Sequence, residues 1–191
     1  MPEFDKRDTV AHLHVGGSDI GVQVLLTAVE ADAIYGGGAA EGWYTIGTLD
    51  GGTFAYEVES EKDLDEAGQQ TGKVIETSAQ WHVANRVKES SDAVLKLLLT
   101  TLQSPHRFRY PLPAGDDGAG NKLHQLWGLY NGLATPGFDF PTAAGEKRLV
   151  TLDLTGTKTD TTPAFEFATV DLADEPNWPA ALDAFKDAAA P

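Results

Sequence analysis

The stretch KVIETSAQWHVANRVKESSDAVLKLLLTTLQ, residues 73–103, contains two hydrophobic periods in succession. Up to residue 88, apolar and polar residues alternate, which is typical of a β-strand with one buried face. The apolar series is Ile75, Thr77, Ala79, Trp81, Val83 and Val87, and the polar series is Glu76, Ser78, Gln80, His82, Arg86 and Lys88. The alternation continues well beyond the usual strand length of about 5–6 residues. We therefore expect a strand that either crosses a barrel or extends beyond its own sheet into a neighbour.

From residue 91 the period changes to that of a helix. Asp92 and the two serines before it can cap the free N–H groups of a first helical turn, and Pro105 disfavours helical geometry at the residue before it. The apolar stripe of this helix consists of Leu95, Leu98, Leu99 and Leu102. We expect one short helix over residues 91–103 whose leucines are buried in the core.

The rest of the chain predicts further strands separated by turns. Asp50-Gly51 between two alternating runs is a strong hairpin signal, and the glycines of 33–42 predict a loop. We expect strands at 10–15, 20–31, 43–49, 53–59, 148–156 and 163–172, and a terminal helix at 178–190. Such a profile predicts a mainly β fold, a β-sandwich or barrel with a flanking α-helix.

Residues 106–147 carry weaker signals. A short strand is expected at 107–112, residues 122–133 are ambiguous between strand and helix, and 135–146 is irregular. No repeat and no Pro/Ser-rich linker divides the chain. We therefore expect a single domain over 1–191, with 106–147 as a possible insertion on its surface.

Composition excludes several classes of chemistry. The 191 residues include no cysteine, which rules out disulfides, thiolate metal sites and cysteine nucleophiles. The amino-terminal residues have no apolar core of a secretory signal, and no window is apolar enough to span a membrane. We therefore expect a protein made in a cytoplasm. A net charge of -15 repels nucleic acid phosphate. This negative charge either only keeps the protein soluble or gives it a surface that can stay near DNA without adhering to it.

None of the candidate chemical sites is complete. His12 and His14 have a spacing that can hold a metal, but no third ligand is identifiable. Asp116 to Asn121 lacks the distal glutamate of a calcium loop and indicates an Asx turn. The tryptophans Trp81 and Trp178 belong to apolar series, whereas Trp43 and Trp127 stay open as a sugar platform. We predict no catalytic residue, no metal and no cofactor.

The order of these elements resembles that of phage tail tube proteins, also called major tail proteins of long-tailed phages. The resemblance is carried by IGTLDGGTFAYEVE, an acidic stretch with Gly68-Gln69, the K-x-I-x-T opening of the long strand at Lys73, and an E-S-S start to the helix at Glu89. It covers residues 43–103 best. The family resemblance implies a small β-sandwich or barrel, six copies in a ring, rings stacked into a tube, and double-stranded DNA passing through the channel during ejection.

The resemblance also implies site residues and partners. The polar face of the long strand would line the channel, and the lumen-facing candidates are Glu76, Ser78, Gln80 and His82. The acidic stretch 59–72 is expected to be an exposed loop or the tip of an extended hairpin. Its candidates for contact between rings are Glu59, Glu61, Asp63, Asp65 and Glu66. The expected partners are further copies of the chain and the tape measure, terminator and distal tail proteins, in the virion tail.

Two other readings stay open. One is a tail terminator or head–tail completion protein, which forms a single ring and does not stack. The other, from a different class, is a carbohydrate-binding or enzymatic β-sandwich that uses Trp43, Trp127 and the glycine loop 33–42.

Overall fold

The computed structural model of the chain describes residues 21–46, 54–64, 66–85, 92–139, 149–157, 159 and 162–187. The expected strand at 10–15 with its two histidines and the Asp50-Gly51 turn lie outside the described residues, as do Asp65, Arg86 and Lys88.

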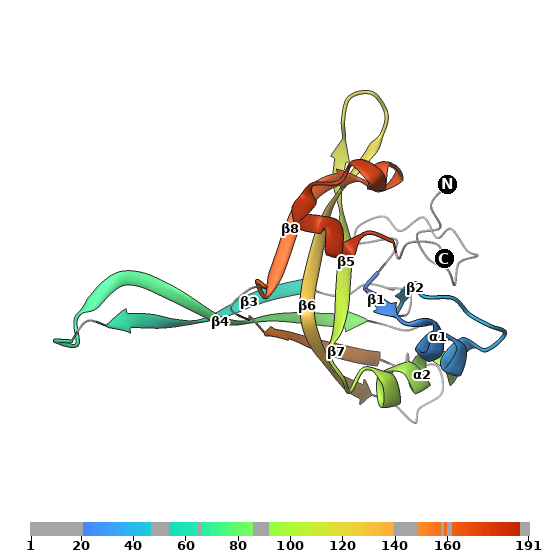
Figure 1. Ribbon diagram of the computed structural model, residues 1–191, viewed down its shortest axis with the longest axis horizontal. Coiled ribbons are helices and arrows are strands. Elements are labelled where there is room, and N and C mark those ends of the chain that lie inside the picture. Colours follow the sequence, from blue (N-terminus) through green and yellow to red (C-terminus); the bar gives the residue numbers. More distant parts are fainter. Residues whose placement is uncertain are drawn as a thin grey trace.

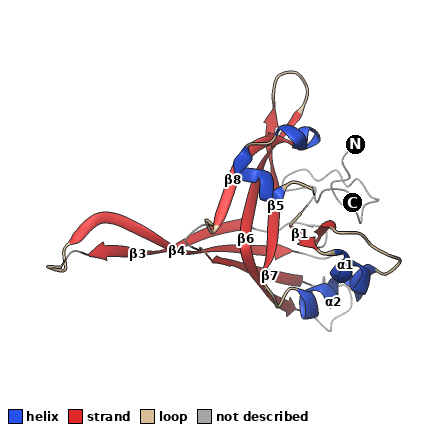
Figure 2. Cartoon of the chain, viewed as in Figure 1, coloured by secondary structure: helices blue, strands red, loops and turns tan. Residues whose placement is uncertain are grey.

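Strands dominate the described chain (Figure 2), and they form one eight-stranded antiparallel sheet. The strands are β1 (Gln23–Leu26), β2 (Gly42–Thr45), β3 (Phe54–Leu64), β4 (Gln70–Asn85), β5 (His106–Asp116), β6 (Lys122–Asp139), β7 (Leu149–Thr157) and β8 (Phe165–Asp171). Their order is β2-β1-β5-β6-β7-β4-β3, and β8 pairs with β6. The expected mainly β fold with a flanking helix is therefore confirmed, and the long strand predicted over 73–88 is β4.

The centre of this sheet is β6, which has three partners. Its first half pairs with β5 on one side and β8 on the other, and its second half pairs with β7. Residues 106–139 thus form two central strands, and the expectation of a surface insertion is wrong. The short strand expected at 107–112 is part of β5. The stretch 135–146 looked irregular, and Pro136 lies there within β6, although proline is tolerated in strands where its missing N–H faces away from the ladder.

The strand expected over 20–31 ends early because a helix begins inside it. β1 stops at Leu26, and α1 (Ala28–Tyr35) follows directly. Thr27 Oγ1 accepts a hydrogen bond from the Glu30 backbone N–H, and Glu30 accepts one from the Thr27 N–H at 2.9 Å. This capping box satisfies two N–H donors of the first turn. Gly36, with φ of 69°, ends the helix in a conformation that favours glycine.

The leucine-rich segment is helical as expected, but its second half is a π-helix and not an α-helix. An α-helical turn, α2 (Asp92–Lys96), continues as a π-helical turn, η1 (Leu97–Thr101), and the Leu102 N–H donates to the Leu97 carbonyl. The π-helical i→i+5 winding shifts the buried face relative to the α-helical stripe. As a result Leu98 and Leu102 are buried as expected and Leu95 is half-buried, whereas Leu99 is 51% exposed and Leu97 is buried in its place.

Each face of the sheet carries its own core. Trp43 and Tyr44 are consecutive on β2, so their side chains lie on opposite faces. Tyr44 belongs to a core covered by α1 and by the leucines of α2 and η1, and Figure 1 shows these two helices side by side. Trp43 belongs to a second core, which is completed by residues from the end of the described chain.

The segment that completes the second core differs from the expected terminal helix. Two 3-10 helices, η2 (Leu172–Asn177) and η3 (Ala180–Phe185), replace one α-helix. The expected apolar face is nevertheless buried, since Trp178, Leu182 and Phe185 are all at most 5% exposed. Among the described residues, no helix is long and apolar enough to cross a membrane.

Candidate assembly surfaces

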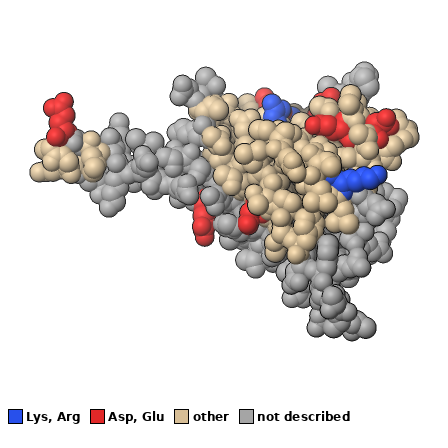
Figure 3. Space-filling model, turned by 90° about the horizontal axis from the view of Figure 1, so that it is seen from below, with Lys and Arg blue, Asp and Glu red and all other residues tan. Residues whose placement is uncertain are grey.

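The most prominent feature of the molecule is an arm made of β3 and β4, which projects far from the body (Figures 1 and 3). The two strands pair from Phe54↔Val83 at the base to Leu64↔Gln70 near the tip. A turn with Gly68 at φ of 76° connects them. The stretch 59–72 is therefore the tip of an extended hairpin, which was one of the two expected forms, and is not a loop.

Among the described strands, the body supports the arm only in its inner half. β7 pairs with β4 from Ser78 to Asn85 and reaches no further toward the tip. Beyond Ser78, β4 pairs only with residues 60–64 of β3. The outer half is therefore a two-stranded ribbon with an open edge on each side. Isolated two-stranded ribbons are at best marginally stable in water.

The lumen-facing candidates lie where the arm joins the body. Ser78, Gln80 and His82 follow one another at every second residue of β4 and share one face of the strand. A register shift opposite Glu59 and Ser60 separates Glu76 from them, so Glu76, which pairs with Ser60, lies on the other face by register. By register, Gln80 lies between Glu57 of β3 and Thr155 of β7. Their side chains lie outside the described part of the chain, so their facing a channel stays a prediction.

The candidates for contact between rings are divided between a strand and a turn. Glu59, Glu61 and Asp63 lie on β3 rather than in a loop, and Asp65 lies outside the described residues. Glu66 is exposed in the turn, and Figure 3 shows an acidic side chain at the tip of the arm. Leu64 beside it is 56% exposed. The tip therefore presents both an apolar and an acidic side chain to solvent.

The free edges of the sheet are not equivalent. Among the described strands, β2, β3 and β8 each pair with a single neighbour along one edge. β5 pairs with β1 only at Phe108 and Arg109, so its remaining length also has an open edge. Pro111 and Pro113 lie on that open stretch and have no N–H to offer an incoming strand. Strand addition is therefore disfavoured at β5 and possible at β2, β3 and β8.

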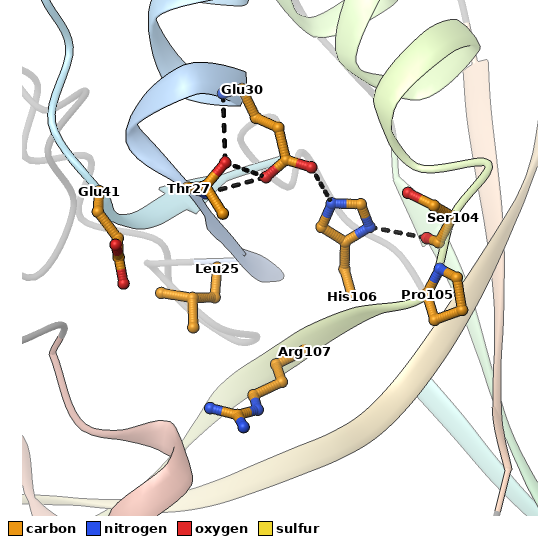
Figure 4. A pocket seen from close by; sticks show the side chains of 8 residues that line it. All are labelled: Leu25, Thr27, Glu30, Glu41, Ser104, Pro105, His106 and Arg107. Carbon is orange, nitrogen blue, oxygen red and sulfur yellow. Dashed lines mark hydrogen bonds and ion pairs between the residues drawn. The ribbon is translucent and has the colours of Figure 1, made fainter.

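One concave site is a shallow depression between α1 and β5 (Figure 4). It has a volume of about 230 Å³ and a floor formed in part by Leu25. His106 Nδ1 lies 2.7 Å from the Ser104 carbonyl, and His106 Nε2 lies 3.1 Å from Glu30 Oε1. Burial raises the pKa of Glu30, but its hydrogen bonds with Thr27 and His106 outweigh this, and the net shift is downward. Both ring nitrogens of the histidine are thus engaged by the protein itself, which indicates a structural contact between α1 and β5.

Trp43 cannot contribute to the carbohydrate-binding surface considered above. Trp43 is completely buried, with its Nε1 donating to the Lys186 carbonyl. Trp127 is half-buried and stacks on Phe167, at 5.0 Å between ring centroids. A tryptophan that binds a sugar must offer a ring face to solvent, and Trp43 offers none. No group of three or more metal-ligating side chains occurs in the part of the chain that the structure describes.

Comparison with known proteins gave matches among solved structures alone. No family model and no curated protein matches the sequence. One similar structure is the sheath-tube complex of PVC, an extracellular contractile injection system, with 8% identity over 83% of this chain and 95% of that one and a TM-score of 0.44. The tube-terminating cap of the anti-feeding prophage has 9% identity over 86% and 98%, with a TM-score of 0.43. A gene transfer agent virion has 11% identity over 77% and 95%, with a TM-score of 0.40.

Proposed function

We propose that the protein is a structural subunit of a phage-type tail tube. Six copies form a ring, the rings stack, and the tube conducts double-stranded DNA during ejection. The subunit has no catalytic role. The observation that carries this proposal is the arm, because its outer half is a two-stranded ribbon that pairs with no other described strand of its own subunit.

A neighbouring copy supplies what the arm lacks. Four pairs hold the outer half together, from Ser60↔Glu76 to Leu64↔Gln70. Contact with a second subunit would bury the exposed Leu64 side chain and shield the open backbone edges. Burying a leucine stabilises a structure by about 1.5–3 kcal/mol. An arm of this kind is therefore best explained as an element that becomes ordered against the next subunit or the next ring.

The open edges of the sheet support a closed ring. In a head-to-tail ring, one edge of each subunit meets a different edge of the next, and closure leaves no free edge. The β2, β3 and β8 edges are available for such pairing, whereas Pro111 and Pro113 protect the open stretch of β5. The two prolines thus suit a subunit that pairs at some of its edges and not at β5.

Net charge suits a channel for DNA. Six copies at -15 each would carry -90 in one ring. A basic wall would bind phosphates through many contacts and hold the DNA, whereas an acidic wall repels it and permits fast passage. We propose that Ser78, Gln80 and His82 on one face of β4 line this channel, and that Glu76 joins them beyond the register shift. The assembled protein would reside in the virion tail after assembly in the bacterial cytoplasm, in contact with tape measure, terminator and distal tail proteins.

Truncation of the arm tests the proposal. Replacing residues 60–77 by Asn-Gly would join the paired residues Glu59 and Ser78 through a two-residue hairpin and leave the body intact. We expect the intact chain to form hollow filaments in negative-stain electron microscopy, and the truncated chain to stay folded by circular dichroism but form none. A matched control shortens the other projecting hairpin, at 117–121, and should still give filaments.

Other outcomes would change the assignment. Isolated six-membered rings of the intact chain under all conditions would favour the terminator or completion protein instead. Filaments of normal length from the arm-truncated chain would contradict the role of the arm. A stable monomer that never assembles at high concentration would overturn the proposal as a whole.

A further inference from the structure

Residues 172–187 lie across one face of the sheet and are held there by side chains of the strands. This segment, which we call the strap, contains η2 and η3, and Figure 1 shows it passing over β8 and β5. Four side chains of the sheet donate hydrogen bonds to backbone carbonyls of the strap. These bonds join Trp43 to Lys186 at 2.8 Å, Arg109 to Phe185 at 2.6 Å, Arg107 to Ala184 at 3.5 Å and Tyr130 to Ala181 at 3.4 Å. The sheet therefore holds the strap in the way that a groove holds a bound peptide.

The apolar anchor of the strap is Phe185, which is completely buried. Its ring lies between Trp43, at 6.4 Å between centroids, and Tyr130, at 4.7 Å. It also lies directly over Gly128, where a Cβ atom would come within 2.4 Å of the ring. The glycine thus opens a recess in β6 that the phenylalanine ring fills.

The charged anchor of the strap is less well balanced. Arg109 of β5 is fully buried, and its guanidinium lies 4.3 Å from the centre of the Trp43 ring. Two strap carboxylates contact it at 3.4 Å each, Glu175 Oε1 and Asp187 Oδ1. The Asp187 backbone N–H donates to the same Glu175 oxygen at 2.7 Å. With all three groups ionised, the cluster carries one more negative charge than positive, and leaving a charge uncompensated in a buried site is costly.

We propose that protonation of Glu175, beside Asp187 and the buried Arg109, controls the docking of the strap: with the proton bound, the strap docks more firmly on the sheet, and when the proton is lost, the strap opens more often.

The titration of the cluster supports this direction. Burial, followed by the hydrogen bond and the charge of Asp187, raises the pKa of Glu175 to about 7. Burial also lowers the pKa of Arg109, to about 10, so the guanidinium stays charged at neutral pH. The remaining charges of the strap are engaged elsewhere, since Lys186 Nζ binds Asp183 Oδ1 at 2.6 Å and Asn177 Nδ2 donates to Asp174 Oδ1. The proton is therefore assigned to Glu175.

The sign of the pH dependence follows from the raised pKa. In the open strap Glu175 would titrate near its ordinary value of 4.5, and in the docked strap near 7. Docking is then strongest below the ordinary value, weakens as the pH rises through 7, and changes little above that. Between pH 6 and pH 8 these two pKa values give an increase of about tenfold in the opening equilibrium of the strap.

Hydrogen–deuterium exchange of the full chain tests the proposal, with rates expressed as protection factors so that the intrinsic pH dependence of exchange is removed. The amides of 178–187 should lose about tenfold in protection between pH 6 and pH 8. Glu175→Gln, which keeps the shape and removes the charge, should stay protected at both pH values. Asp183→Asn, a matched loss of one negative charge on the same strap, should behave like the parent chain.

Each contrary result is decisive. Constant protection of the parent chain between pH 6 and pH 8 would overturn the proposal. So would a Glu175→Gln variant that keeps the full pH response, or one that is open at both values, because the ionised carboxylate would then be what holds the strap. A flat response of Asp183→Asn would show that any lost negative charge suffices, and would also overturn it.

Discussion

Substituting Gly128 by alanine tests the packing of Phe185 on the sheet most directly. The added Cβ would lie 2.4, 2.5 and 2.6 Å from three carbons of the Phe185 ring, and real Cβ contacts are not found below 3.0 Å. The ring is completely buried, so it cannot swing into solvent. Either the ring or the β6 backbone must move.

The expected magnitude combines two opposing effects. Overpacking in a filled core costs about 1–3 kcal/mol. Replacing glycine in a strand by alanine returns about 0.5–1 kcal/mol, because the unfolded chain loses conformational freedom. The net expectation for Gly128→Ala is a loss of about 1–2 kcal/mol in the free energy of unfolding. For a chain of this size that corresponds to a fall of roughly 2–8 °C in Tm.

A double-mutant cycle attributes this loss to the Phe185 ring. Urea unfolding, followed by circular dichroism, would compare Gly128→Ala in the parent chain and in a Phe185→Leu background. Leucine lacks the ring atoms with which the new methyl group collides. The alanine should therefore cost less in the leucine background, by about 1 kcal/mol or more. Equal costs in the two backgrounds would refute the reasoning, because the ring would then not lie over Gly128.

Two further predictions concern the helices. Leu98→Asp should prevent folding, because it buries an unpaired charge, whereas Leu99→Asp should change the free energy of unfolding by no more than about 0.5 kcal/mol. The solubility and thermal unfolding of the two variants would check this. Equal destabilisation by both substitutions would show that η1 is not wound as described. Thr27→Ala removes the capping box and should destabilise α1 by about 1 kcal/mol. Hydrogen exchange should then become faster at residues 28–35 but not in β6. Unchanged exchange in α1 would contradict the stabilising role of the cap.

Sequence reasoning succeeded where one local period dominates. The alternation after Lys73 predicted β4, and the leucine spacing predicted the helical segment that follows. The prediction that Leu99 is buried was wrong because a π-helical turn changes the period within the segment, and no neighbouring residue in the sequence indicates that change. The helix α1 could have been predicted, since Thr27 and Glu30 have capping-box spacing, but the Val- and Leu-rich run before them resembled a strand.

Contacts between residues far apart in the chain were harder to predict from the sequence. Only residues 107–112 of β5 were expected as a strand, and only the sheet order reveals that Pro111 and Pro113 lie along an open edge. Arg109 reads as a surface cation, because nothing near it in the chain indicates burial. Its partners Gln23, Glu175 and Asp187 lie 86, 66 and 78 residues away. The strap and its charged anchor therefore could not be predicted from local pattern.

The position of the strap along the chain bears on how the subunit is made. A ribosome delivers all eight strands before it reaches residue 172. At roughly 5–20 residues per second, the strap emerges one to a few seconds after β8. During that interval Trp43 and the Gly128 recess are uncovered on a nascent chain. A chaperone that recognises aromatic surface would find its target there, and the arrival of Phe185 would end that opportunity.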